Sequence, residues 1–169
     1  MIVTKKSKDL MDVYMDPKAR PLVKHPYSLI TAENQVIFII ASGQNGIEYN
    51  KTEGYFSNFE GVSIYQCLYG QGILLMQRND EVGEAKEFKV VTLNAGRQVG
   101  VPVGWAMCIV NIGKTFLVVV GNLDINSKYI DSKPVFEKQG LAYYVVEKKG
   151  EIGFKQNPNY ENHPQITTE

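Results

Sequence analysis

The sequence predicts a single all-β domain, an antiparallel sandwich or barrel, from two observations. From Asn34 onward, many short segments rich in Val, Ile, Phe and Tyr alternate with turn-forming residues at regular spacing. The same region contains no segment of a dozen residues with helical periodicity. With 169 residues, of which 44% are hydrophobic, the chain has enough material for one core and little room for a second domain. Regularly spaced short strands therefore favour a sandwich or barrel.

The first 33 residues are expected to form an irregular arm. Pro17, Pro21 and Pro26 interrupt a polar stretch and disfavour regular structure. A short helical turn around Asp9 to Tyr14 is compatible with the pattern. We expect this arm, residues 1–33, to pack on the barrel or on a partner subunit.

Eight segments after the arm are expected to be strands, because turn signals such as Tyr69-Gly70-Gln71-Gly72 and Asn94-Ala95-Gly96 separate them. The expected strands span residues 36–41, 62–68, 73–77, 86–92, 98–101, 106–111, 115–120 and 141–147. The barrel is expected to cover residues 34–160. The polar segment 161–169 shows no apolar pattern, so we expect a mobile tail.

Two of these strands are apolar at consecutive positions: Val-Ile-Phe-Ile-Ile-Ala and Phe-Leu-Val-Val-Val. A half-exposed strand alternates apolar and polar residues, so these strands are expected to be covered on both faces. The arm is a candidate for one cover and a second subunit for the other. A symmetric homodimer is therefore expected.

Composition excludes several classes of protein. Eighteen Lys and Arg balance eighteen Asp and Glu, so the basic surface of a nucleic-acid or anionic-membrane binder is missing. The longest apolar run is far short of the roughly 20 residues of a membrane helix, and no apolar stretch follows the N-terminus as in a signal peptide. Cys67 and Cys108 are too few for a disulfide framework, and we expect reduced thiols in a cytoplasmic protein.

One spacing pattern stands out among the expected strands. Gly96, Pro102, Gly104 and Asn111 resemble the second cupin motif, G-x5-P-x-G-x2-H-x3-N, with Met107 in the histidine slot. Upstream, Ser63 and Gly70 resemble the second half of the first cupin motif, with serine in the glutamate slot, and Tyr55-Phe56-Ser57 falls where H-x-H is expected. The resemblance implies a cupin double-stranded β-helix, a jelly-roll barrel, with an irregular N-terminal arm.

Longer stretches narrow the family. They are Thr52-Glu53-Gly54-Tyr55-Phe56-Ser57, Ser63-Ile64-Tyr65, Gly70-Gln71-Gly72, Leu74-Leu75-Met76-Gln77, Val101-Pro102 to Trp105-Ala106, and Val110-Asn111-Ile112-Gly113. In this order they resemble the cupin-type glucose-6-phosphate isomerases best known from archaea. The N-terminal Asp9 to Tyr14 and the C-terminal Tyr144 to Glu147 extend the resemblance over most of the chain.

The family resemblance implies a divalent metal held by two histidines, a glutamate and a third histidine. In this chain the four slots hold Tyr55, Ser57, Ser63 and Met107. A hydroxyl is a weak ligand for a divalent first-row metal, and a thioether prefers soft ions. We therefore expect no metal and no other cofactor. An alternative metal site from Glu53, Glu60 or Cys67 has no supporting spacing.

The same departures affect catalysis. Aldose–ketose isomerisation needs a positioned base and an electrophile that stabilises an oxyanion. Ser63 has no useful basicity near neutral pH, and the phenol of Tyr65, with an ordinary pKa near 10, is a poor replacement without help. Catalytic residues are therefore unknown from sequence, with Tyr65 and Ser63 as candidates in the pocket.

The slots for a sugar phosphate are better preserved. The resemblance implies that Thr52, Gly54, Tyr65 and Tyr129 line a pocket for a sugar phosphate, and a Thr hydroxyl beside a Gly N–H suits an anion. The alternative is that Thr52 and Gly54 only form a turn and the tyrosines fill the barrel. Cys67 is expected to point inward as an ordinary buried thiol, and Trp105 to pack at the barrel mouth.

Three functions follow. The first is a cupin that binds a sugar phosphate, or a similar polyol, without a metal and without turnover. The second is an active glucose-6-phosphate isomerase with a different base or metal. The third is a structural or interaction protein whose barrel is simply filled.

Overall fold

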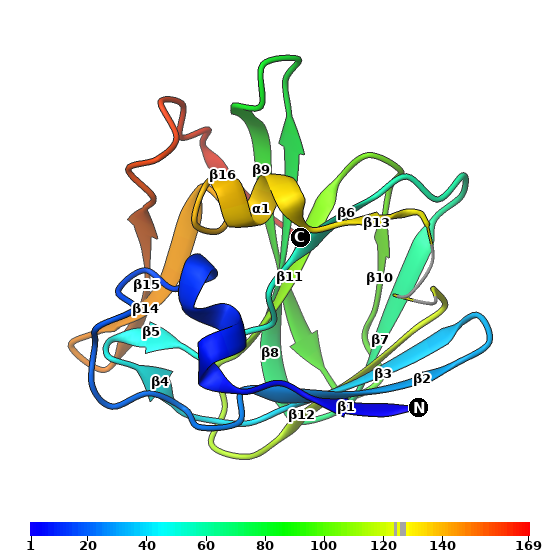
Figure 1. The fold of residues 1–169 in the computed structure, drawn as a ribbon, viewed down its shortest axis with the longest axis horizontal. Helices are drawn as coiled ribbons and strands as arrows, with labels where there is room; N and C mark the ends of the chain where they lie inside the picture. Colours follow the sequence, from blue (N-terminus) through cyan, green and yellow to red (C-terminus); the bar gives the residue numbers. More distant parts are fainter. Residues whose placement is uncertain (124, 126–127) are drawn as a thin grey trace.

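The structure is a computed structural model that describes residues 1–123, 125 and 128–169. Two six-stranded sheets curve around a common interior, and a smaller four-stranded sheet lies beside them (Figure 1). The expected all-β jelly-roll architecture is confirmed.

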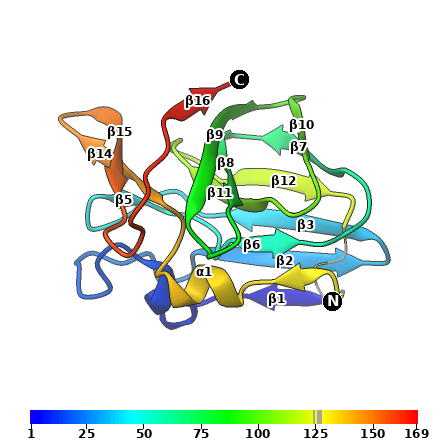
Figure 2. The same ribbon diagram turned by 90° about the horizontal axis from the view of Figure 1, so that it is seen from above.

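The first six-stranded sheet is antiparallel throughout and forms one wall of the barrel (Figure 2). In spatial order its strands are β1 (Ile2–Thr4), β2 (Tyr27–Ala32), β3 (Gln35–Ile40), β12 (Leu117–Gly121), β7 (Ser63–Tyr69) and β10 (Gln98–Val101). Register partners share a face of a sheet. Phe38 pairs with Leu29 on one side and Val119 on the other, and all three side chains are buried in the core.

The second six-stranded sheet forms the other wall. Its order is β13 (Ile130–Asp131), β6 (Tyr55–Ser57), β11 (Ala106–Asn111), β8 (Gln71–Asn79), β9 (Ala85–Asn94) and β16 (Ile166–Thr168). Strand β11 lies inside this sheet and is buried at every residue. It therefore carries the Met107 slot into the centre of the barrel wall.

The third sheet and two short helices close one end of the barrel (Figure 1). The sheet contains β15 (Glu151–Gln156), β14 (Tyr143–Lys148), β5 (Glu48–Tyr49) and β4 (Gln44–Asn45). The 3-10 helix η1 (Ser7–Val13) and the helix α1 (Lys133–Glu137) contact each other.

The motif residues build turns, as their spacing predicts. Asn111 is fully buried, and its amide nitrogen donates to the carbonyl oxygens of Ile40 and Thr115 while its side-chain oxygen accepts from the Gly113 N–H. Gly104 has a φ of +81°, which favours glycine, and its N–H donates to the Ser57 carbonyl. Through these hydrogen bonds, the motif residues connect β11 and the loop that precedes it to β3 of the first sheet and to β6.

All eight expected strands are present, with ends shifted by a few residues. The structure differs from the expectation at both ends of the chain. The arm is irregular only between η1 and β2, since β2 pairs edge to edge with β3 and extends the sheet instead of covering its face. In the segment expected to be mobile, Ile166–Thr168 forms β16, which pairs in parallel with β9.

The outer face of the first sheet is uncharged. None of its six strands contains Asp, Glu, Lys, Arg or His. The outward positions include Ile37 and Ile39 on β3 and Val118 and Val120 on β12, which are only half-buried. Strand β2 of the arm pairs edge to edge with β3 and so does not lie over this face of the sheet.

Candidate functional site

A cavity of about 190 Å³ opens on the inner side of the first sheet, near β2 and β3. This volume is below the roughly 300–1,000 Å³ of pockets for drug-sized ligands, so it suits a small ligand. The described residues that line it are Lys5, Tyr27, Leu29, Phe38, Thr52, Glu53, Gly54, Tyr55, Ile125, Ile130 and Ser132. Within that set only Lys5 and Glu53 carry a charge. The cavity therefore combines aliphatic and aromatic side chains with hydroxyl groups and one ion pair.

Lys5, Glu53 and Tyr27 form the polar part of the cavity. The Lys5 Nζ lies 2.9 Å from Glu53 Oε1, and the two side chains are 26% and 16% exposed. Tyr27 is buried, and its phenol interacts with Glu53. Burial, and secondarily the charge of Glu53, raises the pKa of Tyr27 far above 10, so its hydroxyl remains protonated at neutral pH.

Thr52 and Gly54 lie in the segment that leads into β6. The Thr52 hydroxyl accepts from the Ile109 N–H at 3.0 Å and donates toward Cys108 Sγ at 3.8 Å. Gly54 has a φ of +89°, and a Cβ there would lie 3.3 Å from the Met107 carbonyl oxygen. Residues 52–54 form an irregular segment and not the expected turn, and both Thr52 and Gly54 are part of the cavity wall.

The residues in the four metal slots are all buried, but they do not form a metal site. Tyr55 and Met107 are register partners on β6 and β11, and the Tyr55 hydroxyl is hydrogen-bonded to the hydroxyl of Tyr65. The Ser57 Oγ accepts from the Phe59 N–H at 3.3 Å, while Ser63 lies on β7 opposite Val101.

The chemistry of these donors does not fit the divalent metal that the family resemblance implies. Burial raises the pKa of Tyr65 to about 12 and the pKa of Tyr55 well above 10, so both remain neutral phenols. The Tyr55 hydroxyl is already hydrogen-bonded. Serine hydroxyls and a thioether complete a set with no anionic or imidazole ligand. Among residues 1–123, 125 and 128–169, no three His, Cys, Asp or Glu side chains gather as a metal site, including Glu53, Glu60 and Cys67.

The tyrosines expected in the pocket occupy different environments. Tyr65 lies behind Tyr55 and packs against Phe38, with ring centroids 6.5 Å apart, so it contributes to the filled interior. Tyr129 packs edge-on against Phe59 at 5.8 Å, at the end of β6. Of the four positions inferred for ligand binding, Thr52 and Gly54 are the two that line the cavity among the described residues.

Trp105 and both thiols are buried, which for Cys67 matches the expected inward orientation. Trp105 is 9% exposed, and the Lys89 Nζ lies over its ring, 5.4 Å from the ring centre. Cys67 and Cys108 are free and buried, and desolvation raises the pKa of both thiols, that of Cys108 to about 11. Both are therefore protonated and unreactive near neutral pH.

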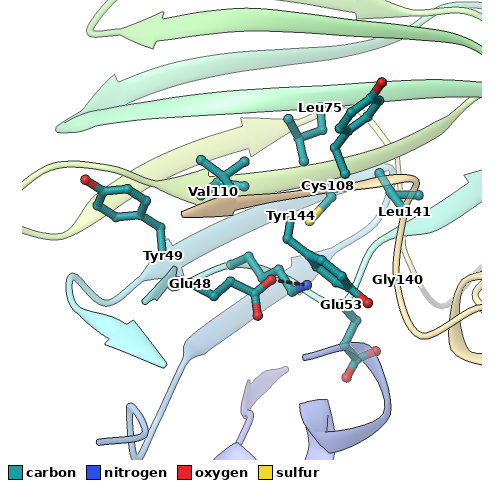
Figure 3. Close-up of a pocket in the computed structure, with 12 residues that line it drawn as sticks. Glu48, Tyr49, Glu53, Leu75, Cys108, Val110, Gly140, Leu141 and Tyr144 are labelled. Atoms are coloured by element: carbon teal, nitrogen blue, oxygen red, sulfur yellow. Dashed lines mark ion pairs between the residues drawn. The ribbon is translucent and has the colours of Figure 1, made fainter. Parts of the chain in front are cut away.

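A second, much smaller pocket holds a buried ion pair that the sequence does not reveal (Figure 3). The Lys51 Nζ lies 2.7 Å from Glu48 Oε2, with the side chains 7% and 1% exposed. The same ammonium donates to the Val13 carbonyl at 2.6 Å and lies 5.0 Å from the ring centre of Tyr144. With a volume of about 10 Å³, this pocket holds no ligand larger than water, and the ion pair is structural.

Lys5 and Tyr27 are among the residues of the main cavity that sequence reasoning missed. Lys5 belongs to the arm and Tyr27 to the undetected strand β2, and the pairing of β1 with β2 brings both to the segment that contains Glu53. No local pattern marks either residue, because long-range strand register places them. In the part of the chain that the structure describes, no helix is long and apolar enough to span a membrane.

Comparison with known proteins shows which family the chain belongs to. A family model described as glucose-6-phosphate isomerase (GPI) matches residues 4–163. No curated protein sequence gives a significant match. Among solved structures, a mutant of Bacillus subtilis oxalate decarboxylase is similar at 14% identity and a TM-score of 0.50, over 69% of this chain and 30% of that chain. The Drosophila melanogaster CENP-C cupin domain is similar at 11% identity and a TM-score of 0.44, over 58% of this chain and 68% of that one. The expected cupin fold is thereby confirmed.

Proposed function

Because the chain belongs to the glucose-6-phosphate isomerase family, we propose that its cavity binds a hexose phosphate without the family's divalent metal. The observation that carries this proposal is the Lys5 ammonium at a cavity whose wall contains Thr52 and Gly54. An ammonium, a hydroxyl and a backbone N–H are a sound set of partners for a phosphate group.

The present partners of these groups leave room for a ligand. The single donor of the Thr52 hydroxyl points at a sulfur atom 3.8 Å away, a weak acceptor that a phosphate oxygen would displace. The Lys5–Glu53 pair is partly exposed, so little free energy is lost when the ammonium turns to an anion. Leu29, Phe38 and Ile130 supply an apolar wall for the carbon face of the sugar. The two free thiols support a reducing compartment such as the cytoplasm.

Calorimetric titration tests this function. Chelator-treated protein is titrated with glucose 6-phosphate, fructose 6-phosphate, mannose 6-phosphate and free glucose. We expect saturable binding of at least one phosphate and weaker binding of glucose. Lys5→Met is expected to reduce the affinity about tenfold or more, since a charged hydrogen bond contributes roughly 1.5–3 kcal/mol. Lys8→Met, an exposed lysine on η1, is the matched control and should bind normally. No heat with any sugar at millimolar concentration contradicts the proposal.

We also propose that a second copy of the chain covers the outer face of the first sheet. Because its six strands carry no charge, two such faces meet without repulsion between like charges, as an isologous interface requires. Light scattering should report about twice the chain mass of 19.0 kDa. Val120→Lys on this face should yield monomers, whereas Thr92→Lys on the exposed side of β9 should not. A monomeric unmodified protein at high micromolar concentration contradicts the proposal.

A further inference from the structure

The main cavity contains one positive and one negative side chain, held against each other. Among the described residues that line it, Lys5 is the only cation and Glu53 the only anion, and Lys5 Nζ lies 2.9 Å from Glu53 Oε1. Resting on the proposed binding of a hexose phosphate in this cavity, we infer that the preferred ligand is an aminohexose phosphate, whose ammonium pairs with Glu53 while its phosphate pairs with Lys5. Each charge of the cavity then meets the opposite charge on a single ligand.

Binding of a phosphate at Lys5 changes the surroundings of Glu53. When the ammonium turns to the phosphate, the Glu53 carboxylate, which is 16% exposed, loses its counter-charge and faces an anionic ligand. The lost attraction is small because the pair is partly exposed, but the repulsion between the two anions adds to it. The described residues that line the cavity include no second cation that could offset this repulsion. A cation carried by the ligand itself removes the conflict.

The surroundings of Glu53 also favour an ammonium over a hydroxyl. Tyr27 is buried and its phenol interacts with Glu53, but burial raises the pKa of this phenol far above 10, so it adds no charge of its own. An ammonium offers three donors to the carboxylate. Hydrogen bonds in which a group is charged are roughly twice as strong as neutral ones, and here both partners are charged. An amino group on the sugar therefore gains more from Glu53 than a hydroxyl does.

The two charged side chains are anchored so that a ligand can separate them. The Lys5 N–H donates to the Tyr27 carbonyl at 2.8 Å, which fixes the backbone, while the flexible four-carbon stem lets the ammonium move away from Glu53. Glu53 directly follows Thr52, in the segment that we propose binds the phosphate. Figure 3 shows that Glu53 extends to a different side of the chain from Glu48, whose carboxylate belongs to the buried ion pair. Glu53 is therefore the carboxylate that a ligand in this cavity meets.

Calorimetric titration of chelator-treated protein at pH 7 tests the inference with three probes: glucose 6-phosphate, glucosamine 6-phosphate and N-acetylglucosamine 6-phosphate. We expect glucosamine 6-phosphate to bind at least about tenfold more tightly than glucose 6-phosphate, the gain from one charged hydrogen bond. The N-acetylated sugar lacks the cation and should show no such gain.

A charge-neutral variant assigns the preference to its residue. Glu53→Gln keeps the shape of the side chain and removes its negative charge. We expect this variant to lose the preference for glucosamine 6-phosphate, and to bind glucose 6-phosphate at least as tightly as the unmodified protein, because the repulsion is gone. Glu33→Gln removes an exposed carboxylate in the β2–β3 turn and should retain the preference.

Each other result overturns the inference in a distinguishable way. Equal affinities for glucose 6-phosphate and glucosamine 6-phosphate remove the inference and leave the proposed function intact. Binding of the N-acetylated sugar as tightly as glucosamine 6-phosphate shows that the charge does not decide. A preference that persists in Glu53→Gln assigns the ammonium to another group. Absence of binding of all three sugars contradicts the inference together with the proposed function.

Discussion

Replacing Lys51 with methionine is expected to destabilise the fold by about 3–5 kcal/mol, because it leaves a buried carboxylate without its counter-charge. Glu48 is 1% exposed and has the Lys51 ammonium at 2.7 Å. After the substitution, the hydrogen bond that the structure retains to this carboxylate is the Met15 N–H at 3.0 Å, and the Val13 carbonyl loses its donor as well. Such a loss is a large fraction of the roughly 5–15 kcal/mol that stabilises a typical domain.

Urea denaturation measures this effect. With a slope of about 1–3 kcal/mol per molar urea, the midpoint should fall by about 1 M or more. Glu48→Gln combined with Lys51→Met should recover part of the loss, because no buried charge then remains. Lys133→Met breaks an exposed pair with Glu137, whose side chains are 81% and 63% exposed, and should leave the midpoint nearly unchanged. A Lys51→Met midpoint as close to the unmodified protein as that of Lys133→Met would refute the reasoning.

Three further predictions concern packing, pH and metal. Gly72→Ala should lower the free energy of unfolding, measured by thermal denaturation, by about 1–3 kcal/mol, because its Cβ would lie 2.3 Å from Leu117 Cδ2. Gly153→Ala is the control and should be tolerated, because its Cβ would have no neighbour closer than 3.6 Å. In the folded protein the pKa of Cys108 is raised to about 11 and that of Tyr65 to about 12. Both groups have lower pKa values in the unfolded chain, so the unfolded chain loses these protons at lower pH than the folded protein does. Stability should therefore be full below pH 9 and decline between pH 9 and 12, as a pH series of urea midpoints will show. Iron, manganese or nickel should not raise the melting temperature, whereas a rise of several degrees would reveal a metal site that the donor chemistry argues against.

Local chemistry made much of the barrel predictable. Glycine and asparagine at fixed spacing, as in Gly104 and Asn111, mark turns, and the Asn111 side chain makes two hydrogen bonds within four residues, to Gly113 and Thr115. Strands such as β3 and β12 are apolar enough to be recognised without their neighbours. Strand β2 was not predicted because it follows three prolines in a polar segment. Its structure depends more on pairing with β3 than on its own sequence.

The cavity was predictable only where it coincides with the motif. Thr52 and Gly54 lie in the motif, but Lys5 reaches Glu53 through the pairing of β1 with β2 and of β2 with β3, which no short pattern encodes. The polar tail segment Ile166–Thr168 is a strand because the edge of β9 offers unpaired backbone groups, again a property of the partner. Long-range register is therefore the information that sequence reasoning lacked.

A titration of isotope-labelled protein with glucose 6-phosphate, followed through the backbone amide signals in the presence of a chelator, tests the account most directly. The shifted signals should belong to residues around the cavity, with Thr52, Glu53 and Gly54 among the largest changes. Saturation should occur without added metal. Unchanged signals at millimolar sugar phosphate, or changes confined to surfaces away from this cavity, would contradict the claim that the family's binding pocket persists after its metal ligands have been replaced.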